Sequence, residues 1–306
     1  MGRAVQSKTN RSRGATKRDY PQRFTEVAST VVRRGRAEAG EELHGKRRSL
    51  SALFERAVLL EQANDCYALD SDFGCVAAGE GFPNSKEAAT RALAIDEKLA
   101  EAHTSLGLVK RDYDWDWPGA EQEFKRAIEL NPNYPTAHQW YAVYLSALGR
   151  HQEAIAEIKR ALELDPLSLL VNSVTARVLY FARQYDEAIE QSRKTIEMDR
   201  RFTATYQHLG SSYAQKGMYA QAVATFQELN KVAPDNINGL AFLACAYALA
   251  GKTDEAQKIL AQLKEVSARR NVSPYHVAMI YAGLGDKEPG PASRAKSIES
   301  CLPFLP

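Results

Sequence analysis

The sequence predicts an all-α fold in which pairs of helices repeat along the chain and stack as a solenoid. One observation is a run of alanines spaced 34 residues apart, namely Ala120, Ala154, Ala188, Ala222 and Ala256. A second ladder of small residues has the same period: Ala142, Ala176, Gly210, Ala244 and Ala278. Within each period the apolar residues are spaced by three or four, as in an amphipathic helix. One period shared by several columns indicates a repeated structural unit.

Each period contains signals for two helices and for the turns that end them. Ala142 lies on the apolar stripe of a first helix, and Gly149 follows it. Glycine is favoured at the left-handed position that ends a helix, and the same column reads Gly149, Arg183, Gly217, Gly251 and Gly285. A second stripe at 154–162 predicts the second helix, which Pro166 stops because proline cannot continue a helix. The small residues of both ladders predict close contact between the two helices.

A helix pair of this kind leaves one apolar face uncovered, and stacking of the next pair buries it. The 34-residue unit with these columns resembles the tetratricopeptide repeat. The resemblance implies a right-handed α-solenoid with full repeats at about 100–134, 135–168, 169–202, 203–236 and 237–270, and the first helix of a sixth at 271–284. Upstream, 85–95 is expected to be a second helix that follows an insertion at 70–84. The predicted organisation is a basic, disordered arm at 1–48, irregular helices at 49–99, the repeat array at 100–286 and an irregular tail at 287–306.

A narrower resemblance involves the segments 101–132, 139–148 and 273–286. They resemble the repeat array at the C-terminus of bacterial signalling proteins, where it follows a winged-helix, serine/threonine kinase or adenylate-cyclase-like domain. Two features depart from that pattern: the chain between 57 and 64 is too short for a normal inter-repeat turn, and Lys-Glu-Pro-Gly-Pro at 287–291 breaks the helix expected after Asp286. The resulting hypothesis is a truncated or rearranged relative of such an array.

Charge is distributed unevenly along the chain. Residues 1–50 contain 13 Lys and Arg against 5 Asp and Glu, which leaves 27 basic and 33 acidic residues in 51–306. An arm that is basic and poor in apolar residues is predicted to be disordered. One alternative gives the arm a nucleic-acid-binding role through phosphate contacts, although only Tyr20 and Phe24 interleave with the basic residues. The other alternative gives it no role.

Membrane and secretion signals are not found in the sequence. The longest nearly apolar run, at 239–251, has 13 residues, whereas a spanning helix needs about 20. The basic N-terminus is not followed by the apolar segment of a secretory signal. The cysteines Cys66, Cys75, Cys245 and Cys301 form no Cys-x-x-Cys pair. We therefore expect a soluble cytoplasmic protein.

No group of residues in the sequence points to catalysis, a metal or a cofactor. The histidines His44, His103, His138, His151, His208 and His276 are scattered and form no His-Glu-x-x-His pair. Gly79-Glu80-Gly81 begins like a phosphate loop but has no third glycine and no preceding strand. Most carboxylates have basic residues three or four positions away, as in solvent-exposed helix pairs. The expectation is a non-enzymatic protein with no cofactor.

The stretch 114–118, Asp-Trp-Asp-Trp-Pro, is the most unusual local sequence. Pro118 suits the first turn of a helix, and Asp116 is placed to cap it. We expect one of the two tryptophans to pack in the turn between helices.

The surface best suited to a partner is the one lined by the first helices. Its columns carry aromatic, amide and hydroxyl side chains and one arginine, which suit a peptide held in side-chain pockets. The candidates are Gln139, Trp140, Val143, Ser173, Arg177, Tyr180, Gln207, His208, Ser211, Phe242, Tyr275 and His276. Some tetratricopeptide arrays hold a partner's terminal carboxylate with Lys and Asn at set columns, which here carry Gln139, Val143, Ser173 and Arg177 and do not predict that clamp.

Two functions are consistent with these features. The first is a non-enzymatic interaction module that binds a peptide or a partner protein. The alternative is a detached regulatory module of a signalling protein, or a nucleic-acid-associated factor that acts through residues 1–48. The sequence does not identify the partner or the oligomeric state.

Overall fold

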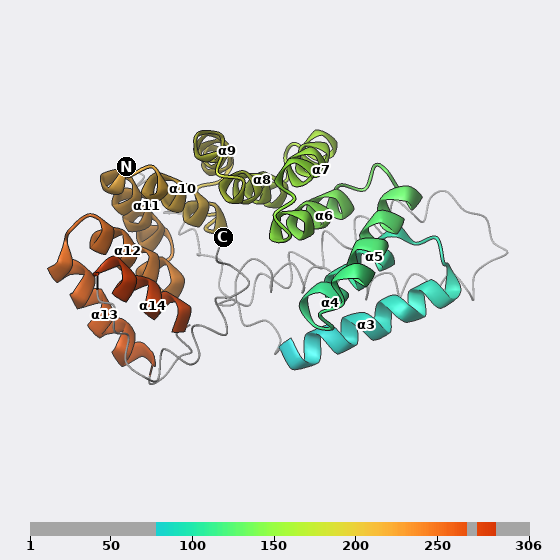
Figure 1. The fold of residues 1–306 in the computed structure, drawn as a ribbon, viewed down its shortest axis with the longest axis horizontal. Coiled ribbons are helices and arrows are strands. Elements are labelled where there is room, and N and C mark those ends of the chain that lie inside the picture. Colours follow the sequence, from blue (N-terminus) through green and yellow to red (C-terminus); the bar gives the residue numbers. More distant parts are fainter. Residues whose placement is uncertain (1–77, 268–273, 286–306) are drawn as a thin grey trace, which may run out of the picture. The chain divides into compact units, whose positions relative to one another are not determined.

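The structure, a computed structural model, describes residues 78–267 and 274–285, which form twelve helices and no strand (Figure 1). The helices are α3 (Ala78–Ile95), α4 (Ala100–Asp112), α5 (Trp117–Leu130), α6 (Pro135–Ala147), α7 (His151–Leu164), α8 (Leu169–Phe181), α9 (Tyr185–Met198), α10 (Ala204–Gln215), α11 (Tyr219–Val232), α12 (Ile237–Leu249), α13 (Thr253–Ser267) and α14 (Pro274–Gly283). The all-α fold class is thereby confirmed. Among these helices, none combines the length and the hydropathy needed to cross a bilayer.

From α4 onward the helices pack as pairs: α4 with α5, α6 with α7, α8 with α9, α10 with α11, and α12 with α13. Each first helix also contacts the first helix of the next pair, in the order α4, α6, α8, α10, α12 and α14. Each second helix contacts the first helix that follows it in the chain. These contacts make the fold a solenoid of helix pairs, as the sequence period predicts.

A left-handed residue ends each first helix from α6 onward. The φ angles are 73° at Gly149, 61° at Arg183, 71° at Gly217 and 74° at both Gly251 and Gly285. Beyond Gly149 the backbone N–H of Arg150 donates to the carbonyl of Leu145 over 2.9 Å, and the same bond recurs at each later turn from α8 to α12. These bonds satisfy carbonyl groups that the end of a helix would leave unpaired.

Small residues at the two ladders allow the helices of a pair to approach closely. Ala120, Ala154, Ala188, Ala222 and Ala256 are all fully buried. Where the facing residue is a phenylalanine, the first helix has glycine: a Cβ on Gly107 would lie 2.7 Å from the ring of Phe124, and one on Gly210 would lie 2.7 Å from both Cε atoms of Phe226. The phenylalanine ring therefore occupies the space that a Cβ at the glycine would need, since protein interiors are close-packed.

A polar residue near the start of the first helix ties each of the first repeats together. The ring of His103 lies between two acceptors: its Nε2 is 3.1 Å from the carbonyl oxygen of Glu97, and its Nδ1 is 2.6 Å from the Glu123 carboxylate. Lys110 also binds that carboxylate, over 2.7 Å. The hydrogen bond to Glu123 raises the pKa of His103 above its ordinary value, because only the imidazolium can donate from both nitrogens.

The same arrangement recurs in the next two repeats. His138 places one nitrogen 2.6 Å from Glu157 and the other 3.0 Å from the carbonyl of the preceding loop. Asn172 replaces the histidine in the third repeat, donates to the preceding loop over 2.9 Å, and accepts from Gln191 over 2.6 Å. These histidines are therefore packing residues that join a first helix to its second helix.

Helix α3 differs from the sequence expectation. The predicted helix covered 85–95 and followed an insertion, whereas α3 begins at Ala78 and contains Pro83. Phe82, on the added part, is buried and its ring stacks on Tyr113 with centroids 5.8 Å apart. This tertiary contact favours helix at a position where local Gly and Pro propensities disfavour it.

The turn at 114–118 follows the expectation. The side chain of Asp116 accepts from the backbone N–H of Gly119 over 3.0 Å and caps α5. Trp117 packs on Tyr144, with ring centroids 5.7 Å apart, whereas Trp115 is 64% exposed. The predicted arm at 1–48, the helices expected before residue 78 and the tail at 287–306 lie outside the described residues.

Candidate partner-binding pocket

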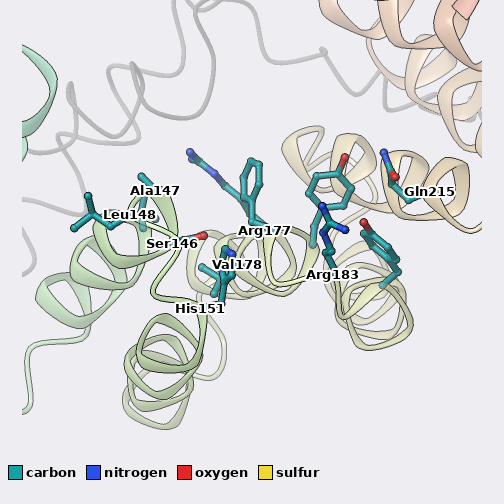
Figure 2. Close-up of a pocket in the computed structure, with 13 residues that line it drawn as sticks. Ser146, Ala147, Leu148, His151, Arg177, Val178, Arg183 and Gln215 are labelled. Atoms are coloured by element: carbon teal, nitrogen blue, oxygen red, sulfur yellow. The ribbon is translucent and has the colours of Figure 1, made fainter. Parts of the chain in front are cut away.

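A cavity of about 680 Å³ lies where the first helices α6, α8 and α10 end (Figure 2). Its walls come from the last turns of α6 and α8, from the turns after them, from the first residues of α7 and α9, and from the end of α10. The lining residues are Val143, Ser146, Ala147, Leu148, Gly149, His151, Arg177, Val178, Tyr180, Phe181, Arg183, Tyr185 and Gln215. Three successive repeats thus contribute to one pocket.

Part of the lining is apolar and open to solvent. Leu148 and Phe181 are 44% and 37% exposed, which is high for large apolar side chains. Tyr180 contacts the ring of Phe181 edge-on at 5.4 Å between centroids, and the ring of Tyr185 at 5.8 Å. The rings hold one another in place, so this wall presents fixed aromatic surface to a ligand.

Two arginines give the pocket its charge. The guanidinium of Arg177 lies 5.8 Å from the centre of the Phe181 ring, and Figure 2 shows its side chain between Ala147 and Leu148 on one side and Gln215 on the other. Burial, followed by the positive charge of Arg111, lowers the pKa of Arg177 to about 10. Within the described residues neither Arg177 nor Arg183 forms an ion pair, and no carboxylate lines the pocket.

Two polar atoms of the lining are buried without a hydrogen-bond partner in the described residues: the Ser146 hydroxyl and Nδ1 of His151. A buried polar atom that lacks a partner is unfavourable by about 1–3 kcal/mol.

Arg183 has a left-handed backbone conformation, and the equivalent position in the later repeats is occupied by glycine. Its φ is 61°, and the equivalent residues of the next turns along the chain are Gly217 and Gly251. A left-handed conformation is unfavourable by about 1–2 kcal/mol for a residue with a Cβ. Strain of this kind at a pocket is an observation from which a functional role can be inferred.

A family model described as tetratricopeptide repeat matches residues 116–178 and 213–273. Helices α6 and most of α8, which supply much of the pocket, belong to the first stretch, and Gln215 belongs to the second. No curated protein matches the chain significantly.

Solved structures with a similar fold include PilF of Pseudomonas aeruginosa, with a TM-score of 0.57 and 16% identity over 79% of this chain and 100% of PilF. PilW, a type IV pilus biogenesis factor, has a TM-score of 0.58 and 16% identity over 73% of this chain and 97% of PilW. A thermophilic tetratricopeptide protein of Thermus thermophilus has a TM-score of 0.50 and 19% identity, covering 61% of this chain and 98% of that protein. At these identities the likeness shows the fold alone.

The sequence-predicted site residues divide into several groups in the repeats. Val143, Arg177 and Tyr180 line the large pocket. Gln207 and Phe242 line a second cavity of only about 20 Å³ between α10 and α12.

His208 and Ser211 are half-buried on α10 and line neither of these cavities. Burial, followed by the charge of Arg177, lowers the pKa of His208 to about 3, so it is neutral at physiological pH. Tyr275 and His276 belong to α14, but their side chains lie outside the described residues.

Three predicted residues are part of the core and line neither cavity. Gln139, Trp140 and Ser173 are at most 2% exposed, so a partner cannot touch their side chains in this conformation. Trp140 packs beneath the guanidinium of Arg111, 5.5 Å from the ring centre. The period correctly placed them on first helices, but the neighbouring repeats cover them.

Several pocket residues were missed at the sequence level. Leu148, Phe181 and Gln215 are the last residues of first helices or lie directly after them, beyond the columns chosen as the binding surface. Arg183 carried a visible signal, since it is an arginine in a column of glycines.

The described residues contain no cluster of His, Cys, Asp or Glu that could hold a metal ion. Burial raises the pKa of the Cys245 thiol to about 12, so this sulfur is protonated and unreactive near neutral pH. The pocket lining in the described residues combines two arginines, aromatic rings and two polar atoms without a hydrogen-bond partner.

Proposed function

We propose that this chain is a non-enzymatic interaction module that binds a peptide segment of a partner protein at the ends of its first helices. The observation that carries the proposal is the pocket over α8, in which exposed apolar side chains surround two arginines that have no ion-pair partner among the described residues. Pockets with an apolar lining and a few well-placed polar groups are typical of ligand sites. Aromatic side chains and arginine are also the residues most enriched where proteins bind one another.

The proposed binding surface retains part of the sequence-level set. It consists of Val143, Arg177 and Tyr180, to which the pocket adds Leu148, Phe181 and Arg183. Gln207, His208, Ser211 and Phe242 would extend the surface along α10 and α12. In this proposal the repeat array at 100–286 is the binding domain.

A finer proposal concerns the cellular role. The sequence resemblance of 101–132, 139–148 and 273–286 to the arrays of bacterial signalling proteins supports a regulatory module that acts in the cytoplasm. In that role the array would recruit or sense a protein partner and would perform no chemistry itself.

A crosslinking pulldown tests the proposed function. The full chain is compared with Arg177→Glu, which reverses the charge inside the pocket. The control is Arg126→Glu, a matched change on the exposed face of α5, where Arg126 forms an ion pair with Glu129. We expect Arg177→Glu to lose partners that the wild type and Arg126→Glu retain. Identical partner sets for all three proteins would contradict the proposal.

A further inference from the structure

The pocket is positively charged within a part of the chain that is otherwise acidic. Residues 51–306 contain 27 basic and 33 acidic residues, yet the pocket lining has two arginines and no carboxylate. Most arginines of the array's outer surface are paired, as Arg126 is with Glu129 and Arg160 with Glu163. Among the described residues, Arg177, Arg183, Arg193 and Arg201 are the arginines that form no ion pair, and two of these four line the pocket.

The two arginines are under different constraints, because burial acts on the charge of Arg177 more strongly than the nearby carboxylate of Asp112 offsets it, whereas the strain at Arg183 is in its backbone. Arg177 is surrounded by protein and lies near the like charge of Arg111, and both effects disfavour its cationic form. Arg183 holds a left-handed backbone conformation at a turn where glycine serves in the neighbouring repeats. Its side chain makes no hydrogen bond or ion pair within the described residues that would offset the backbone cost, and it lines the pocket.

We propose that this pocket binds an acidic segment of the partner peptide, with carboxylates paired to Arg177 and Arg183 and a neighbouring large apolar side chain placed on Leu148 and Phe181. The proposal rests on the function proposed above and specifies the chemistry of the ligand. Arginine suits this role because its guanidinium can bind a carboxylate through two parallel hydrogen bonds.

Charge and shape together exclude other occupants. A purely apolar segment would bury both guanidinium groups without an acceptor, which is strongly unfavourable. A basic segment, such as residues 1–48 of this chain, would be repelled. The exposed rings of the lining favour an acidic residue that is followed or preceded by a bulky apolar one, since the apolar side chain then covers Leu148 and Phe181.

The left-handed turn provides a variant that separates binding from folding. Arg183→Gly removes the pocket charge and introduces the residue that the same turn position carries at Gly217 and Gly251. It is expected to unfold at the same temperature as the wild type or higher, so a loss of binding cannot be ascribed to unfolding. Arg177→Gln removes the second charge on α8, and Arg126→Gln is the matched control outside the pocket.

The test is a selection of peptides from a random library displayed on phage, with the full wild-type chain as bait and an unrelated helical repeat protein as background. The enriched peptides are synthesised, and their dissociation constants are measured by fluorescence anisotropy with each variant. We expect enriched sequences in which Asp or Glu adjoins Phe, Leu, Trp or Tyr. Arg183→Gly and Arg177→Gln should each weaken binding by about tenfold or more, while Arg126→Gln leaves it unchanged.

A peptide analogue with Gln in place of Glu closes the cycle. It should bind the wild type as weakly as the acidic peptide binds the double variant that combines Arg177→Gln with Arg183→Gly. It should bind that double variant no more weakly than it binds the wild type. Enriched peptides without an acidic residue, or peptides that bind Arg183→Gly and the wild type equally, would overturn the pocket proposal and leave the interaction function standing. No enrichment over the background bait would overturn both.

Discussion

Replacement of Gly210 by alanine tests whether the close contact between a first and a second helix is set by the facing phenylalanine. A Cβ at this position would lie 2.7 Å from both Cε atoms of Phe226 and closer still to Cζ. That ring cannot easily withdraw, because it is 2% exposed and stacks on Phe242 with centroids 5.5 Å apart. The first helix or the ring must therefore move to admit one methyl group.

Two opposing effects determine the magnitude. Alanine is favoured over glycine in a helix by about 0.8–1.0 kcal/mol. Overpacking a well-packed core is unfavourable by about 1–3 kcal/mol. The sum predicts that Gly210→Ala lowers the free energy of unfolding by about 1 kcal/mol, whereas the same change in a helix without the ring would raise it by about that amount.

The chain itself supplies the compensating pair, since Ala244 faces Leu260 at the equivalent positions of a later repeat, and both residues are buried. We therefore expect Gly210→Ala to become neutral or stabilising in a Phe226→Leu background. The wild type, Gly210→Ala, Phe226→Leu and the double variant form a double-mutant cycle, and their free energies of unfolding are measured by urea unfolding followed by circular dichroism. A coupling energy below about 0.5 kcal/mol, the error of additivity for independent sites, would refute the reasoning.

Three further predictions follow from the same contacts. His103→Gln should destabilise the array most below about pH 6.5 and progressively less as the pH rises, because the raised pKa of His103 means that its protonated form stabilises the fold and that this effect is lost as the pH passes the folded pKa. Thermal unfolding of both proteins from about pH 6 to about pH 9 measures this difference, and a difference in stability that stays constant with pH would contradict the prediction. Arg183→Gly should raise the free energy of unfolding by up to about 1 kcal/mol, since relief of the left-handed strain outweighs the added chain entropy of glycine; a clear loss of stability in urea would show that the side chain has a structural role. Trp140→Ala should lower stability by about 3–5 kcal/mol, because a fully buried indole leaves a cavity, and a melting temperature close to that of the wild type would contradict the assignment of Trp140 to the core.

Much of the fold could be predicted because its determinants are local or periodic. The left-handed ends of the first helices follow from a glycine column, and the cap of α5 follows from Asp116 in front of Pro118. The buried alanines follow from a ladder that recurs at one spacing, since only a small side chain fits where two helices touch. Helix α3 shows the limit of such reasoning, because its first turns depend on the contact of Phe82 with Tyr113.

The binding surface was less accessible to sequence reasoning. A column places a residue on a helix face, but the volumes of the side chains in the adjacent repeats decide whether that face is open. Trp140 and Arg177 were both assigned to the first-helix surface, yet Trp140 is fully buried under Arg111 whereas Arg177 reaches the pocket. The polar column of His103, His138 and Asn172 was also hidden, because its partners lie 19 or 20 residues away on second helices.

The sequence by itself determined the helix pairs, their length and their order of stacking, because a fixed period imposes the same local geometry on each unit and leaves each unit one face to bury. Only the tertiary structure decided where a ligand can enter. The pocket forms from the ends of helices in three successive repeats, and its charge and depth depend on how far each side chain reaches into the space that its neighbours leave. The size of that space depends on the packing of many side chains from different repeats, and no single repeat position in the sequence predicts it.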